Sequence, residues 1–150
     1  MSKANALTFG ERVEGRSYTP RPGAYAIVMD EGKIAVIRGK TGQCFLPGGG
    51  IEEGETAETA LAREVREECG WKIRTATKVG QALQYVATER EGCFALHCTF
   101  FKVSTVGRLR SKVGDHHGDA IEWLSPQEAM TRLERECDAW AIAEAVALLV

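Results

Sequence analysis

The chain has 150 residues, of which 44% are hydrophobic and 27% are charged, and its formal net charge is −2. This length fits one domain, and the composition is that of a globular protein, which excludes intrinsic disorder. The small negative charge argues against general nucleic-acid binding, because such proteins normally carry a basic patch and a high isoelectric point.

Cysteine usage and hydropathy together predict a cytoplasmic protein. The five cysteines are odd in number and include no C-x-x-C pair, which disfavours a disulfide framework and a zinc site. The first residues lack the basic-then-apolar order of a signal peptide. The apolar stretch AIAEAVALLV is too short to span a bilayer and contains Glu144, so we predict no membrane role.

The first expected elements are an arm and a β-hairpin. Residues 1–20 are polar, so we expect an N-terminal arm, with an edge strand around Arg16–Thr19, in front of a single domain at 21–150. The apolar runs GAYAIVMD, from Gly23, and IAVIR, ending at Arg38, flank a tight acidic-glycine turn and predict a hairpin. The first run is apolar on both faces, which predicts a central strand covered on both sides.

A glycine-rich turn and a helix follow the hairpin. The short apolar segment CFLP leads into three glycines, which permit positive φ and a close approach of the backbone to a ligand. Thr56 is a suitable N-cap and Gly70 a natural C-terminal stop, so the sequence predicts a helix over 57–69. Its apolar residues recur at i+4 steps and would pack on the sheet: Ala57, Leu61, Val65 and Cys69.

The remaining segments complete a mixed sheet with helices. Residues 78–88 and 93–106 are rich in β-branched and aromatic residues and flank EREG, which predicts a second hairpin. After a loop at 107–118, AIEWL predicts a short strand, and SPQEAMTRLERE opens with the start signals of a helix. A last helix is expected over about 139–149. This order indicates an α/β sandwich, in which helices cover both faces of a mixed sheet.

Three glutamates stand close together on the helix predicted over 57–69. Glu64, Glu67 and Glu68 occupy positions i, i+3 and i+4, so their carboxylates project from the same side. Like charges at this spacing cost a helix about 0.2–0.5 kcal/mol per pair, and a divalent cation with oxygen ligands would turn that cost into a binding site. The alternative is the solvated acidic face of an amphipathic helix, since Glu is a good helix former.

The stretch from Gly49 to Trp71 resembles the Nudix box, the signature of hydrolases that act on nucleoside diphosphates linked to another group. Only Trp71 departs from the pattern, because an aliphatic residue is usual there. The resemblance implies the Nudix-type α/β/α sandwich with a mixed central sheet. The matching positions have the spacing and the residue types of the box: Gly49, Glu55, Arg63, Glu64, Val65, Glu67, Glu68 and Gly70.

The resemblance also implies a metal site and a brace beside it. Glu64 and Glu68 are the implied ligands of Mg²⁺ or Mn²⁺, with Glu67 joining them and the carbonyl of Gly49 adding a further oxygen. Glu55 and Arg63 are implied to pair and to hold the loop and the helix in register. Magnesium suits such a site, because it prefers oxygen ligands from few carboxylates together with substrate phosphates.

The implied reaction is attack of a metal-activated water on a pyrophosphate linkage, which releases a nucleoside monophosphate and a second phosphorylated product. A nucleoside triphosphate or a dinucleoside polyphosphate is the favoured substrate. Glu67 is the first candidate for the general base, and the loop before the last strand offers alternatives, which are otherwise plain loop residues: Asp115, His116, His117 and Asp119. The alternative function is a Nudix-fold nucleotide-binding or regulatory module without turnover.

Three residues outside the box are candidates for substrate contact. Arg38 either clamps a phosphate at the end of a strand or is an ordinary surface cation. Tyr25 and Tyr85 are candidates for stacking on a base, although packing in the core or on the sheet is the interpretation we favour. The expected partner is a small-molecule nucleotide, with no membrane and no nucleic acid, and we expect a monomer or a homodimer.

Overall fold

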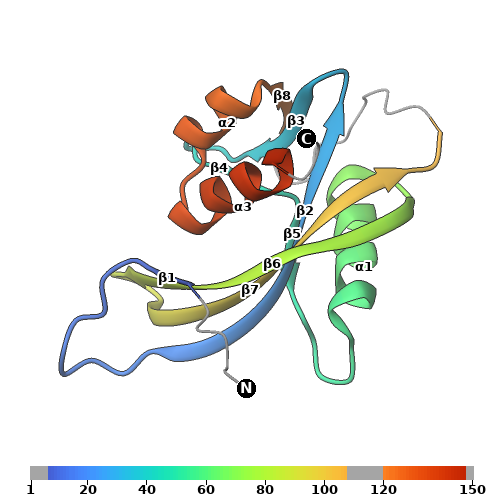
Figure 1. Ribbon diagram of the computed structural model, residues 1–150. Coiled ribbons are helices and arrows are strands. Elements are labelled where there is room, and N and C mark those ends of the chain that lie inside the picture. Colours follow the sequence, from blue (N-terminus) through green and yellow to red (C-terminus); the bar gives the residue numbers. More distant parts are fainter. Residues whose placement is uncertain (1–6, 108–119, 148–150) are drawn as a thin grey trace.

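The computed structural model describes residues 7–107 and 120–147, which form one mixed sheet with helices packed on it (Figure 1). In chain order the elements are β1 (Leu7–Phe9), β2 (Thr19–Asp30), β3 (Lys33–Arg38), β4 (Cys44–Phe45), β5 (Gly48–Gly50), α1 (Ala57–Cys69), β6 (Ile73–Thr88), β7 (Gly92–Thr105), β8 (Ala120–Leu124), α2 (Pro126–Arg132) and α3 (Glu136–Ala147). The strands follow the order β1-β6-β7-β2-β3-β4, while β5 pairs with β2 and β8 pairs with β3.

Strand β2 joins the two halves of this sheet. Its segment 19–28 pairs in parallel with β7, whereas Met29 and Asp30 pair with β3 in the first hairpin. Near its middle, β2 also pairs with the glycine strand β5. Residues 23–28 are buried, which confirms the prediction of a central strand covered on both sides.

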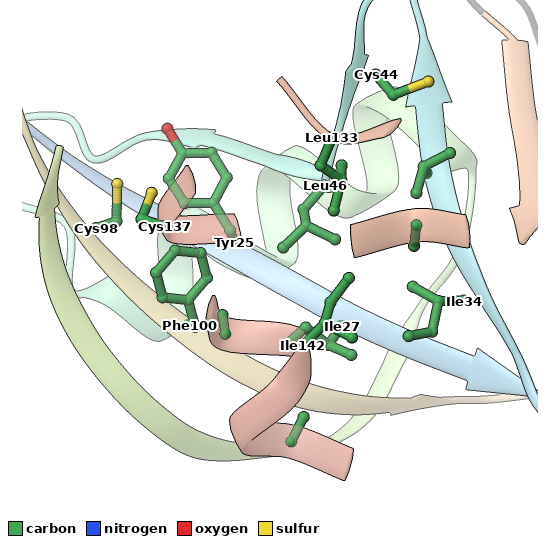
Figure 2. Packing of buried hydrophobic residues seen from close by; sticks show 14 of the residues in the cluster. Tyr25, Ile27, Ile34, Cys44, Leu46, Cys98, Phe100, Leu133, Cys137 and Ile142 are labelled. Atoms are coloured by element: carbon green, nitrogen blue, oxygen red, sulfur yellow. The ribbon is translucent and has the colours of Figure 1, made fainter. Parts of the chain in front are cut away.

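Two hydrophobic cores lie on opposite faces of the sheet. The first contains Ile27 and Ile142 and lies beneath α2 and α3, and Figure 2 shows part of it. The second contains Val28, Leu61 and Val65 and lies beneath α1. Figure 1 shows α1 on one side of the strands and the other two helices on the opposite side. The structure therefore confirms the predicted α/β sandwich.

The N-terminal segment differs from the prediction. The strand expected around Arg16–Thr19 is wrong, because of these residues only Thr19 lies in a strand; instead β1 pairs in parallel with β6. Strand β2 then begins at Thr19 and continues through Pro20 and Pro22, which pair with β7. Pro20 and Pro22 are two residues apart, so their missing N–H donors lie on the same side of β2. A proline is tolerated at an edge of a sheet because no hydrogen bond to a neighbouring strand is lost there.

Two element boundaries also differ, because contacts from distant residues set them. Strand β6 begins at Ile73, before the expected residue 78, and its pairing with β7 is interrupted between Ile73 and Thr75. Helix α3 begins at Glu136, before the expected residue 139. The side chain of Gln84 on β6 accepts a hydrogen bond of 3.0 Å from the backbone N–H of Cys137 and so satisfies the start of this helix. None of the helices in the described ranges has the length and the apolar character needed to cross a membrane.

Candidate active site

Helix α1 forms where its capping residues predict it. Thr56 is the N-cap, and its side-chain oxygen accepts a hydrogen bond from the backbone N–H of Thr59 at 3.1 Å. Gly70 ends the helix in the left-handed conformation, with a φ of 77°. Leu61 and Val65 bury the opposite face of the helix against the sheet. The expected span Ala57–Cys69 is therefore confirmed, and it fixes which face carries the glutamates.

The glycine strand β5 lies directly against that acidic face. Gly48 has a φ of 144°, and a Cβ there would lie 2.2 Å from the carbonyl oxygen of Ala24, so only glycine fits. A Cβ on Gly49 would lie 2.5–2.8 Å from the three carboxyl atoms of Glu64. The missing side chain of Gly49 therefore allows the Glu64 carboxylate to rest against the backbone of β5.

Arg63 and Glu55 brace the loop against the helix, as the resemblance implies. Arg63 donates two hydrogen bonds of 2.8 Å to the two carboxylate oxygens of Glu55 and one of 3.0 Å to the carbonyl oxygen of Gly50. Glu55 also accepts a hydrogen bond of 2.8 Å from the backbone N–H of Glu52. The hydrogen bonds from Arg63, followed by the one from Glu52, lower the pKa of Glu55 to about 2. Glu55 is thus held as a carboxylate.

The three glutamates of α1 occupy different environments. Glu64 accepts a hydrogen bond of 3.0 Å from Arg63, and burial raises the pKa of Glu64 although Arg63 opposes that shift. Glu68 accepts a hydrogen bond of 2.9 Å from the backbone N–H of Gly48. Glu67 is 60% exposed, and its nearer oxygen lies 3.7 Å from Arg63. One half-buried, one backbone-bound and one solvated carboxylate therefore stand side by side at β5.

The donor chemistry of this cluster suits a hard divalent cation. The carboxylates of Glu64, Glu67 and Glu68 and the carbonyl of Gly49 offer only oxygen, which is the ligand type of Mg²⁺. In the described parts of the chain, however, no three His, Cys, Asp or Glu side chains already converge as a metal-holding group. Instead, Arg63 forms ion pairs with Glu64 and Glu67. Because the Glu67 side chain is exposed, it has room to turn toward an ion.

The other predicted contact residues lie in separate places. Tyr25 is buried in the first core, where burial raises the pKa of its hydroxyl to about 12. Arg38 forms an ion pair of 2.6 Å with Glu122 on β8. Tyr85 packs edge-on against Tyr18, with ring centres 5.2 Å apart. The alternative bases lie outside the described residues: Asp115, His116, His117 and Asp119.

One group near the site has no counterpart in the sequence analysis. The guanidinium of Arg135, just before α3, lies 5.0 Å from the ring centre of Phe45 and 5.5 Å from that of Tyr25. Arg135 belongs to the segment LERE, which reads as an ordinary polar part of a helix, and Phe45 reads as part of a short apolar strand. No local pattern connects residues so far apart in the chain, so only the fold reveals this cluster.

Comparison with known proteins assigns this arrangement to a family. Residues 19–148 match the family model described as the NUDIX domain. The chain belongs to the NUDIX family. A MutT-like protein from Streptomyces ambofaciens is 33% identical over 111 residues, which cover 73% of this chain and 66% of that protein. A nucleoside triphosphatase NudI from Escherichia coli is 33% identical over 121 residues, covering 71% of this NUDIX chain and 76% of the relative.

Coverage of these relatives is uneven. A NudI protein from an Enterobacter species is 50% identical, but over 58 residues, which are 37% of this chain and 38% of that protein. The chain thus spans less than two thirds of the length of some of the relatives it matches.

Solved structures show the same NUDIX fold. The E. coli ORF135 protein superposes with a TM-score of 0.67 and 26% identity, over 89% of this chain and 93% of that one. A MutT protein from Methanosarcina mazei gives a TM-score of 0.69 at 19% identity, over 91% and 98% of the two chains. The second likeness concerns the fold alone. Together they support the α/β sandwich described above.

Proposed function

We propose that this NUDIX protein hydrolyses a pyrophosphate linkage in a nucleoside diphosphate derivative with the help of a divalent cation. The observation that carries this proposal is the contact between α1 and β5, where Glu68 accepts from the N–H of Gly48 and the Glu64 carboxylate rests against Gly49. Carboxylates and a glycine backbone so placed form an oxygen-rich cradle beside a strand that a polyphosphate can approach closely.

Each residue of the cradle has a separate proposed role. Glu64 and Glu68, with the carbonyl of Gly49 and with Glu67, would hold Mg²⁺ or Mn²⁺. When bound, such an ion neutralises phosphate charge and makes a water acidic enough to attack near neutral pH. Arg63 and Glu55 keep the loop and helix in register through their paired hydrogen bonds. Arg63 and Glu55 therefore position the loop and the helix and do not contact the reacting atoms.

Glu67 is the proposed general base. Its side chain is 60% exposed, against 19% for that of Glu64, and its carboxylate oxygen is available to accept a proton from the attacking water. Asp119 and His117, which precede β8 in the sequence, are the alternative bases. Glu67→Gln compared with His117→Gln and Asp119→Asn separates the two assignments by the size of the loss in kcat.

The proposed substrate is a nucleoside triphosphate or a dinucleoside polyphosphate. Two relatives bear the name nucleoside triphosphatase NudI, which favours the triphosphate. We further propose that the protein acts in the cytoplasm on free nucleotides, as a monomer or a homodimer.

A second candidate function is a nucleotide-binding or regulatory module without turnover. One observation favours it: Arg63 already pairs with Glu64 and Glu55, and in the described residues the acidic side chains do not converge as a metal-holding group. The two functions differ in turnover, because a binding module would retain nucleotide without releasing product.

A panel of nucleotides incubated with Mg²⁺ and, separately, with EDTA decides between these functions. Hydrolase activity predicts release of a nucleoside monophosphate with Mg²⁺ and none with EDTA. Glu68→Gln should remove most of the activity while circular dichroism remains that of the folded protein. Absence of metal-dependent release across the whole panel would contradict the enzyme and favour the binding module.

A further inference from the structure

Arg135 is held against two aromatic rings at the edge of the first core. Its guanidinium carbon lies 5.0 Å from the ring centre of Phe45 and 5.5 Å from that of Tyr25, which are cation–π distances. The Tyr25 hydroxyl and the buried Asp138 carboxyl also interact electrostatically with the guanidinium. Figure 2 shows that the Tyr25 ring in turn lies close to Phe100, and their ring centres are 5.9 Å apart. The core therefore fixes the position of Tyr25, and Tyr25 helps to fix Arg135.

One side of the cluster is buried in the core, and the other side is accessible. Tyr25 is buried, whereas Phe45 and Arg135 are only partly buried. Arginine carries five N–H donors in a planar fork, and the groups that interact electrostatically with Arg135 include the Tyr25 hydroxyl and the Asp138 carboxyl. A partly exposed aromatic face and a pre-positioned donor fork thus stand next to each other.

This cluster lies immediately across β5 from the acidic cradle. Tyr25 is the strand partner of Gly48, and a Cβ on Gly48 would lie 2.8 Å from the Tyr25 ring. Gly48 in turn donates its N–H to Glu68. Phe45 precedes Gly49 by four positions, so the backbone path between them is at most about 14 Å. A ligand whose phosphates lie at the cradle can place its other end on Phe45.

The chemistry of the cluster favours a nucleobase over a further phosphate. Two aromatic rings lie beside the guanidinium and the buried acid Asp138 interacts with it. A phosphate placed there would have to lose its hydration close to an acidic group. A base is planar and apolar on its faces, and its polar groups lie on its edge. An arginine fork matches a base edge that presents two acceptors, as guanine does through O6 and N7, whereas adenine presents an amino donor at the first of these positions.

We infer that Phe45 and Arg135 form the nucleobase subsite, in which the base stacks on Phe45 and the Arg135 fork donates to two acceptors on its edge. This inference rests on the proposed function, because it assumes that the phosphates of the nucleotide lie at the cradle. Arg135 is then a specificity-determining residue, and the chain prefers guanine over adenine nucleotides.

The test compares GTP, ATP and ribose 5-triphosphate, which has no base, by kcat and KM. One good bidentate contact is worth roughly 5- to 150-fold, so wild-type protein should show a KM for GTP lower than that for ATP by a factor in this range. Arg135→Lys keeps the charge and loses the planar fork. It should raise the KM for GTP toward the value for ATP, leave kcat within about threefold, and leave the KM for ribose 5-triphosphate unchanged.

Arg132→Lys is the matched control, because Arg132 is an arginine close in sequence that pairs with Glu122 instead of a ring. It should leave all three KM values unchanged. Equal KM values for GTP and ATP in the wild type would overturn the inference. The same holds if Arg135→Lys affects all three substrates alike, because Arg135 would then act on phosphate or on the fold.

Equilibrium binding of GTP and ATP in EDTA separates failure of this inference from failure of the proposed function. A preference for GTP that Arg135→Lys removes supports the subsite even if no nucleotide is hydrolysed. Equal binding of GTP and ATP by the wild type refutes the subsite even if hydrolysis is observed.

Discussion

Arg63 connects the glycine loop to α1 through two parallel hydrogen bonds to Glu55, both 2.8 Å long. Such bidentate pairs fix geometry as well as charge. Because Arg63 also donates to Glu64 at 3.0 Å, any loosening of the brace is passed directly to a proposed metal ligand. The brace is therefore expected to matter for activity more than for folding.

Glu55→Gln tests this expectation. The amide can accept fewer of the Arg63 hydrogen bonds and carries no charge, so kcat/KM should fall roughly 10- to 100-fold, as for other residues that orient metal ligands. The melting temperature should change little. Glu52→Gln is the control, since Glu52 is 72% exposed and lies 3.9 Å from Arg63. Equal activity of the wild type and Glu55→Gln would show that the brace has no part in the reaction.

Asp138 is a buried acid with an unsatisfied oxygen. One of its carboxylate oxygens has no hydrogen-bond partner among the described residues. Burial raises its pKa from 3.8 to about 6, although Arg135, Cys137 and the backbone of Leu46 oppose the shift. Between these two pKa values the folded protein binds more protons than the unfolded chain, so this group makes stability fall as pH rises through that window. Above it, the loss is complete and constant.

Asp138→Asn should remove this loss. We expect the variant to be more stable than the wild type at pH 7–8 by about 1–3 kcal/mol, with the difference shrinking toward zero near pH 4. Urea unfolding at several pH values measures it. Glu144→Gln is the control, because Glu144 is exposed on the same helix. Parallel stability curves for the wild type and Asp138→Asn would contradict the proposed cost of burying the charge.

At the scale of elements, the site is the contact between one helix and one three-residue strand. Strand β5 has no side chains of its own, so the carboxylates of α1 approach its backbone directly. Pairing with β2 holds this strand in place from the other side. The glycines are thus part of the shape of the site and not merely a flexible turn.

Gly49→Ala and Gly50→Ala form a matched pair that tests this contact. A Cβ on Gly49 would meet the end of the Glu64 side chain at 2.5–2.8 Å and push it aside, whereas one on Gly50 would meet only Pro22 O, at 3.8 Å. Gly49→Ala should lower kcat/KM roughly tenfold or more, with the fold retained because a side chain yields more easily than the backbone. Gly50→Ala should stay within about twofold of wild type. Similar effects of the two substitutions would contradict the role given to Gly49.

The sequence predicted those elements whose causes are local. Helix α1 has its cap at Thr56 and its stop at Gly70 within its own segment, and the first hairpin has its turn between two apolar runs. The start of α3 depends on Gln84, which lies on β6 far away in the chain. Strand β1 likewise forms only because β6 offers it a parallel edge. Propensity and periodicity contain no information about such partners.

The same distinction explains which parts of the candidate site were predictable. Glu64, Glu67 and Glu68 share one helix face, so their spacing alone brings them together. Arg135 meets Tyr25 and Phe45 only after three separate elements have packed. The proposed base-recognition residues were therefore missed. Tyr25, for which packing in the core was favoured over stacking on a base, lies in the core behind them.

At the scale of the whole molecule, β2 joins the two halves of the sheet, and the two hydrophobic cores lie on its opposite faces. Strand β1 extends the first half at its outer edge, and its Phe9 packs near Trp140 of α3, with ring centres 6.2 Å apart. This contact ties the N-terminal segment to the C-terminal helix on the face of the sheet opposite α1. It should therefore contribute to stability without contributing to the reaction.

Phe9→Ala should lower the free energy of unfolding by about 1–2 kcal/mol, because a partly buried ring is removed. Its kcat/KM should remain within about twofold of wild type. Leu7→Ala is the control, since Leu7 is 47% exposed, and its effect should be below about 0.5 kcal/mol. Guanidinium unfolding and steady-state assays measure both quantities. A large loss of activity in Phe9→Ala would show that β1 supports the site after all.

The central claim is that the acidic face of α1, set against β5, holds a divalent cation. Titration of Mn²⁺ followed by electron paramagnetic resonance tests it most directly, because the signal of free Mn²⁺ falls as the ion binds. We predict that wild-type protein binds Mn²⁺ and that Glu68→Gln weakens its affinity roughly 10-fold or more, whereas Glu53→Gln, which alters an exposed glutamate of the loop, leaves it unchanged. Equal Mn²⁺ affinity in the wild type and Glu68→Gln, or no binding by either, would contradict the claim.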